Sequence, residues 1–146
     1  MANPAKVYLS RYRNLQTKCR SLEETIERLR ERAESITMDL DPDKVQSSAR
    51  IHDPIAEAAA AIADAEQLLR EARRDAAESV NGILHTIDQM PDERLQSLLM
   101  LHYIDGMAWE DVAEFMSYSV RQIYNLHGIA LQEINRIRKD CSELQS

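Results

Sequence analysis

The side chains best suited to specific binding chemistry stand together in residues 120–125. Arg121 can bond to guanine through two hydrogen bonds, and Gln122 or Asn125 can do the same with adenine. Val120 can contact the methyl group of thymine. These residue types, presented at the start of a helix, predict a surface that reads base edges in the major groove of DNA.

Three further side chains are better suited to phosphate groups: Ser119, Tyr124 and Arg136. From residue 119 to residue 139 the only acidic side chain is Glu133, so the local charge favours a phosphate backbone. The basic surface is small, and we therefore expect weak, salt-sensitive binding per chain.

A helix must hold these side chains outward, and the apolar spacing after residue 119 predicts one. Ser119 is suited to capping the first turn of this helix. Its inward face should carry the apolar residues Ile123, Leu126, Ala130, Ile134 and Ile137. Ala113 is the small residue expected where the preceding helix crosses, with Val112 and Phe115 packing against Ile123 and Leu126. The pattern predicts a helix-turn-helix.

The segment from residue 90 to residue 138 resembles region 4 of the bacterial sigma-70 family, the module that binds the −35 promoter element. Met90-Pro91 stands where that family has Leu-Pro, and residues 103–106 (Tyr-Ile-Asp-Gly) resemble its helix end and turn. Residues 109–113 (Trp-Glu-Asp-Val-Ala) resemble its next helix, and residues 119–134 its recognition helix. The whole chain is also similar to small phage and prophage regulators of the ArpU and RinA kind.

The resemblance implies double-stranded DNA as a partner, with RNA polymerase as a possible second one. The family usually places an Arg and a Glu at the first two exposed positions of the recognition helix, whereas this chain has Val120 and Arg121. We therefore do not expect it to read the ordinary −35 sequence. Trp109 stands where the family usually has a small polar residue, and we interpret it as a lid over the small core.

The first 88 residues predict a support for this module. Apolar residues recur in alternating steps of four and three at Tyr8, Tyr12, Leu15, Cys19, Leu22, Ile26, Leu29, Ala33, Ile36 and Leu40. Such a stripe is typical of a coiled coil and requires a helical partner. A second helix should begin at Asp53-Pro54 and carry an alanine-rich stripe at Ile55, Ala58 or Ala59, Ile62, Ala65, Leu69, Ala72, Ala76, Val80, Ile83 and Ile87.

The two helices, residues 5–38 and 54–88, should form an antiparallel hairpin joined by a connector that starts at Asp41-Pro42. Because two helices alone make a thin core, we expect a homodimer or higher oligomer. The fold class predicted is all-α, with a coiled-coil oligomerisation region at 1–88 and a helix-turn-helix domain at 89–146. Lys6, Arg11, Arg13, Lys18 and Arg20 have no acidic neighbour in the first twenty residues, which fits either a solvated face or a second nucleic-acid contact.

Composition excludes several other classes. The net charge is −7, but residues 119–146 carry four basic and three acidic side chains, so the acid lies elsewhere. No apolar run is long enough for a signal peptide or a membrane helix, and we expect a cytoplasmic protein. Two distant cysteines and four scattered histidines predict no metal site, and no side chains are spaced for catalysis, so neither an enzyme nor a cofactor is expected.

Two functions of different class follow. The first is a sequence-specific DNA-binding transcriptional regulator, derived from a phage or prophage, that acts with RNA polymerase. The second is a helical protein-protein interaction module without direct DNA readout, which the acidic side chains of Glu110, Asp111 and Glu114 would suit.

Overall fold

The computed structural model describes residues 2–38 and 53–144, and all regular structure in these ranges is helical. The elements in chain order are α1 (Pro4–Met38), α2 (Pro54–Asp88), α3 (Glu93–Leu99), η1 (Met100–Ile104), α4 (Trp109–Met116) and α5 (Val120–Leu144). This confirms the all-α prediction. The expected helix stop near Leu40 and the connector that starts at Asp41 lie outside the described residues.

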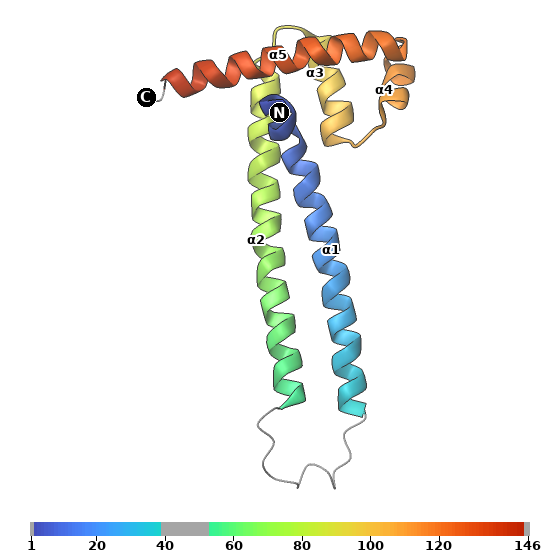
Figure 1. Cartoon of the computed structure of the whole chain (residues 1–146), viewed down its shortest axis with the longest axis vertical. Helices are drawn as coiled ribbons and strands as arrows, with labels where there is room; N and C mark the ends of the chain where they lie inside the picture. Colours follow the sequence, from blue (N-terminus) through green and yellow to red (C-terminus); the bar gives the residue numbers. More distant parts are fainter. Residues whose placement is uncertain (1, 39–52, 145–146) are drawn as a thin grey trace, which may run out of the picture. The chain divides into compact units, whose positions relative to one another are not determined.

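Helices α1 and α2 pack against each other and run in opposite directions (Figure 1). The carboxylate of Asp53 accepts hydrogen bonds from the backbone N–H groups of Ile55 (3.0 Å) and Ala56 (3.3 Å). Asp53 is therefore the N-cap of α2 and Pro54 its first residue, as predicted, because proline lacks only an N–H that would be unpaired there.

The predicted stripe of α1 is confirmed, since every described position of it from Tyr8 to Ile36 is buried or half-buried. In α2 the stripe is confirmed at Ala58 and from Ile62 onward, where every position is buried or half-buried, but its first position is wrong. Ile55 is 46 % exposed, and the half-buried side chains of the first turns are Pro54 and Ala58. The inward face therefore begins one residue earlier than the apolar pattern indicated.

Contacts group the chain into two compact units, Met1–Leu15 with Asp75–Ser146, and Gln16–Arg74. In the second unit Ile26 packs with Ala65 and Leu69, flanked by Cys19, Leu22 and Leu29. Two ion pairs link its helices, Arg30–Glu66 and Arg73–Glu23, each at 2.9 Å. Both pairs are exposed, so each contributes little to stability.

The first unit has a larger core that takes side chains from all six elements. Its fully buried large side chains are Leu9, Ile83, Ile87, Met90, Leu98, Leu99, Val112, Ile123 and Ile134. The core thus includes residues on both sides of the predicted boundary after residue 88. The division into separate domains at residues 1–88 and 89–146 stays a prediction.

A π-helical turn, η1, follows α3 directly. The N–H of Asp105 donates to the carbonyl of Met100 at 3.0 Å, the spacing of five residues that defines such a turn. Gly106 then adopts a φ of +78°, which only glycine reaches easily, and the chain turns into α4. Within the described residues, none of the helices has the length and apolar character required to span a membrane.

Candidate nucleic-acid interface

A tight turn joins α4 to α5. Ser117 adopts the left-handed conformation with a φ of 62°, and the N–H of Tyr118 donates to the carbonyl of Ala113 at 2.9 Å. Such a left-handed residue commonly ends a helix because it lets the following N–H groups reach the last carbonyls. The turn therefore fixes the direction in which α5 leaves α4.

The start of α5 is fixed by a reciprocal pair of hydrogen bonds. The N–H of Gln122 donates to Ser119 Oγ at 3.1 Å, and the N–H of Ser119 donates to Gln122 Oε1 at 2.9 Å. This is a capping box, and it confirms Ser119 as the N-cap. It also occupies the amide oxygen of Gln122, so Asn125 is the side chain with the freer amide for an adenine.

The first turns of α5 present the predicted binding residues on one face. Arg121, Gln122, Tyr124 and Asn125 are exposed, while Val120 is half-buried and packs against the core. The opposite face is buried through Ile123, Ala130, Leu131, Ile134 and Ile137, with Leu126 half-buried against the same core. Except for Leu131, this inward face is the predicted one.

The prediction for α4 is correct at two positions and wrong at a third. Val112 and Ala113 are 0 % and 3 % exposed, as expected for residues that pack against α5. Phe115, however, is 71 % exposed and does not pack against Ile123 or Leu126. The helix is short and ends at Met116, whose half-buried side chain joins the core in place of Phe115.

Arg136 is held by carboxylates of its own helix. Its guanidinium donates to Glu133 and, at 3.3 Å, to Asp140. The hydrogen bond with Glu133 raises the pKa of Arg136 and lowers the pKa of Glu133. To contact a phosphate as predicted, Arg136 would have to give up its ion pairs with these two carboxylates.

A cluster of rings that the sequence did not reveal lies beside these residues. The rings of His102 and Trp109 stack with centroids 3.7 Å apart, and the Trp109 and His127 centroids are 4.3 Å apart. The hydroxyl of Tyr103 is 2.6 Å from Nε2 of His127. Trp109 also contacts Tyr124 edge-on, at 6.2 Å. We call these five residues the ring cluster.

Burial favours the uncharged forms of His102, Tyr103 and His127. Burial, together with the nearby charges of His102 and Lys6, lowers the pKa of His127 to about 4. Burial also lowers the pKa of His102, against a hydrogen bond of 2.8 Å between its Nδ1 and the carbonyl of Met107. The same loss of water raises the pKa of Tyr103 to about 12.

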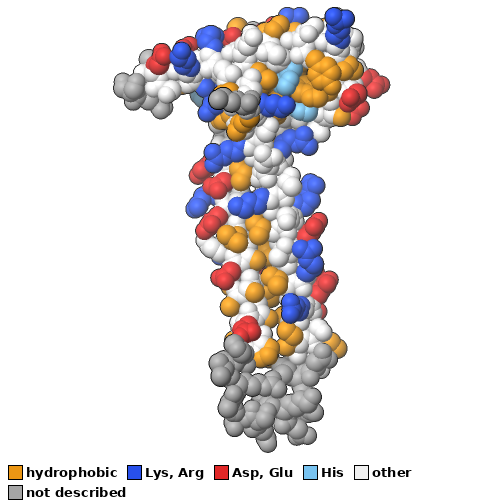
Figure 2. All heavy atoms as spheres, in the orientation of Figure 1, with side chains coloured by type: hydrophobic (Ala, Val, Ile, Leu, Met, Phe, Trp, Pro, Cys, Tyr) orange, Lys and Arg blue, Asp and Glu red, His pale blue; other side chains and the backbone are white. Residues whose placement is uncertain are grey.

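The surface around α4 and α5 carries histidine and a broad hydrophobic area side by side (Figure 2). The half-buried Trp109 and the exposed Tyr124 and Phe115 supply apolar surface on these helices. Trp109 therefore covers the histidines as well as the core, a wider role than the lid that we predicted from the sequence.

A groove of about 680 Å³ lies between the N-terminal part of α1 and α5. Its lining residues are Ala2, Asn3, Lys6, Val7, Ser10, Asn14, His127 and Leu131. The polar side chains among them can all donate hydrogen bonds, and none is acidic. The groove suits an anionic group better than a cationic one.

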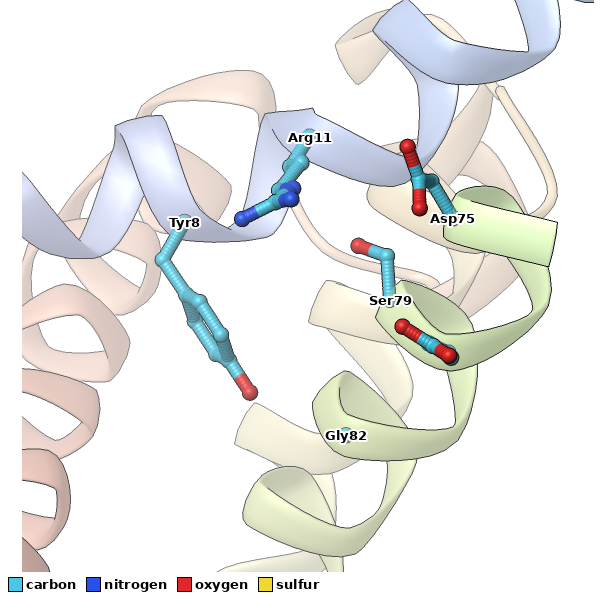
Figure 3. Close-up of a pocket in the computed structure, with 6 residues that line it drawn as sticks. Tyr8, Arg11, Asp75, Ser79 and Gly82 are labelled. Atoms are coloured by element: carbon cyan, nitrogen blue, oxygen red, sulfur yellow. The ribbon is translucent and has the colours of Figure 1, made fainter. Parts of the chain in front are cut away.

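A second, smaller pocket of about 210 Å³ lies between α1 and α2 (Figure 3). Arg11 faces it from α1, and Asp75, Glu78 and Ser79 face it from α2. The Oγ of Ser79 is buried and has no hydrogen-bond partner among the described residues. Because two carboxylates stand beside one guanidinium, this pocket is unsuited to a phosphate group.

The described residues contain no group of three or more His, Cys, Asp or Glu side chains that could hold a metal ion. Cys19 and Cys141 are free thiols. The sequence did not predict that His102 and His127 lie together, because they belong to η1 and α5, and only the packing of these elements joins them.

No protein-family model, curated protein or solved structure matches this chain.

Proposed function

We propose that this protein is a sequence-specific DNA-binding regulator of transcription. In this proposal α4, the turn at Ser117 and α5 act as a helix-turn-helix, and the first turns of α5 enter the major groove. The observation that carries the proposal is the exposed row of Arg121, Tyr124 and Asn125 on a helix whose opposite face is buried. A rigid, outward row of this kind is what base readout requires.

Each side chain has a role that follows from its chemistry. Arg121 would bond to a guanine edge and Asn125 to an adenine edge, while Val120, half-buried, would offer less surface to a thymine methyl. Gln122 would read a base only by giving up its bond with the Ser119 N–H. Ser119, Tyr124 and Arg136 would contact phosphates and so fix the position of α5 in the groove.

The resemblance to region 4 of sigma-70 proteins extends the proposal to RNA polymerase as a partner. We propose a cytoplasmic regulator of phage or prophage origin that acts together with the polymerase. It would work as an activator or as an accessory specificity subunit.

A second candidate function rests on a different observation. Phe115 is 71 % exposed on α4, next to the exposed carboxylates of Glu110, Asp111 and Glu114. A large apolar side chain among acidic ones is typical of a surface that binds a basic protein segment. In this reading α4 is the binding element, and the module does not read DNA.

A mobility-shift screen against DNA upstream of the protein's own operon separates the two. A DNA-reading α5 gives a discrete shifted band that survives excess non-specific competitor, and Phe115→Ser leaves that band unchanged. A chain that shifts no fragment at low salt, where phosphate contacts are strongest, contradicts the first function. Binding that Arg121→Ala leaves intact but Phe115→Ser removes favours the second.

A further inference from the structure

We infer that Lys6, with Ser10 and Asn14 of α1 and His127 of α5, meets a backbone phosphate of the same DNA that α5 is proposed to read. The inference rests on the proposed function and adds a second element to the interface. It concerns the groove of about 680 Å³ described above, which no part of the proposed base readout uses.

The groove has the donors that a phosphate needs. Lys6 brings an ammonium group, Ser10 a hydroxyl and Asn14 an amide N–H₂, and no carboxylate lines the groove. A phosphate oxygen accepts from all three types of donor. Val7 and Leu131 add an apolar wall that can contact sugar carbon atoms.

Lys6 is available for such a contact. It is exposed and forms no ion pair with a carboxylate of the described residues. Its positive charge contributes to the lowered pKa of both His102 and His127, and its side chain lines the same groove as His127. Among the described residues no carboxylate pairs with Lys6, in contrast to Arg136, which two carboxylates already hold.

The groove also lies beside the proposed reading surface. His127 stands three residues beyond Tyr124, about 60° around α5 and about 4–5 Å along it, so the groove flanks the Tyr124 side of the proposed reading surface. A DNA strand that follows the first turns of α5 would therefore pass the mouth of the groove. Charge complementarity and this continuity both identify the occupant as DNA backbone.

The structure separates Lys6 from the other basic residues near the N-terminus. Arg11 lines the same pocket as Asp75 and Glu78, so carboxylates surround it there. Arg13 lies against Gly106, where its guanidinium would meet any added side chain. Lys18 and Arg20 belong to the other compact unit. Lys18, exposed on the same helix and with the same charge, is thus the matched control for Lys6.

The test is a titration of the full-length protein with its preferred DNA and with a scrambled duplex over a range of salt concentrations. Lys6→Ala should weaken binding to both duplexes by the same factor and lower the salt slope by roughly one ion. Between about 50 and 200 mM salt, the fold decrease in affinity should then be roughly 3.5-fold smaller than for the unaltered protein. Lys18→Ala should change neither quantity.

Neutral methylphosphonates, placed one at a time along the duplex, locate the contact. One substitution should weaken the unaltered protein but leave Lys6→Ala unaffected, because the variant has already lost that partner. If every methylphosphonate weakens both proteins equally, Lys6 has no phosphate partner and the inference is wrong.

The inference and the proposed function can fail separately. If Arg121→Ala alters base preference while Lys6→Ala leaves the salt slope unchanged, the function stands and the inference is overturned. If the protein binds no duplex, both fall. Shifts of the His127 ring signals with inorganic phosphate in that case would identify a site for small anions and not for DNA.

Discussion

The hydroxyl of Tyr103 and Nε2 of His127 lie 2.6 Å apart, in a cluster that also stacks His102 on Trp109. A hydrogen bond this short between a buried tyrosine and a half-buried histidine joins η1 to α5, because the two residues stand on these elements. It therefore helps to hold the helix that presents Arg121 and Asn125. The bond is compatible with a neutral His127, since an imidazolium has no lone pair left to accept from the tyrosine.

Acid should therefore weaken the fold. The pKa of His127 is about 4 in the folded chain, below its ordinary value of 6.5, so between these values the unfolded chain binds a proton that the folded chain does not. The stability from the neutral ring is complete above about pH 6.5 and is lost as the pH falls toward 4. Burial lowers the pKa of His102 too, so its effect has the same sign.

Thermal unfolding of the full-length protein between pH 7 and pH 4 measures this effect. His127→Gln should flatten the dependence of Tm on pH, whatever it does to Tm at pH 7. His85→Gln is the control, because His85 is exposed on α2 and touches none of the rings. An equal acid dependence in the His127→Gln variant and the unaltered protein would contradict the role given to His127.

The sequence predicted those features that depend on neighbours along the chain. The caps at Asp53 and Ser119 and the inward stripes of α1 and α5 each follow from residues within a turn or two of one another. Phe115 was misplaced because a short helix gives too few turns to decide which of two adjacent apolar residues faces inward. The ring cluster was invisible because His102 and His127 meet only after η1 and α5 have packed.

The candidate site shows the same division. Exposure of Arg121, Tyr124 and Asn125 follows from the helical period. The helical period does not predict the hydrogen bonds that occupy Gln122 and Arg136. Gln122 bonds to Ser119, and Arg136 to Glu133, only in particular side-chain conformations. The groove at Lys6 requires α1 to pack beside α5, a pairing of residues more than a hundred positions apart.

Ala113 provides a test of the packing between α4 and α5. It is 3 % exposed and part of the core, so Ala113→Leu should overpack the contact and lower the free energy of unfolding by about 1–3 kcal/mol. Glu114→Leu is the control, because Glu114 is exposed on the same helix and a leucine there displaces nothing. Chemical denaturation of the full-length variants gives both values, and equal stabilities would show that Ala113 is not confined.

The predicted assembly can be tested at α2. Among the described residues of the unit Gln16–Arg74 few side chains are buried, and Leu68 is 48 % exposed although it is large and apolar. We predict that the protein is a homodimer or higher oligomer through this unit, and that Leu68→Lys shifts it toward monomer. Light scattering after size exclusion measures the mass, with Gln67→Lys as a control of equal charge. A monomeric unaltered protein at tens of micromolar would rule out the assembly.

The final prediction separates base readout from backbone contact on one helix. Arg121 is exposed in the first turn of α5, so Arg121→Ala should cost about 1–3 kcal/mol on the preferred DNA and relax the preference at one base pair. Arg136 stands about four turns further along, which places it beyond the same part of the groove. Arg136→Ala should weaken binding to all sequences alike and lower the salt slope.

The structure adds a condition to the second half of this prediction. Because Glu133 and Asp140 hold the guanidinium, Arg136→Ala should lower the salt slope by less than a full ion, and Glu133→Gln should strengthen binding to every sequence by freeing the arginine. Titrations of the three variants against a set of single-base changes, each at two salt concentrations, give both quantities. A uniform loss of affinity for Arg121→Ala, with base preference intact, would mean that α5 is not docked in the major groove and would favour the protein-binding function.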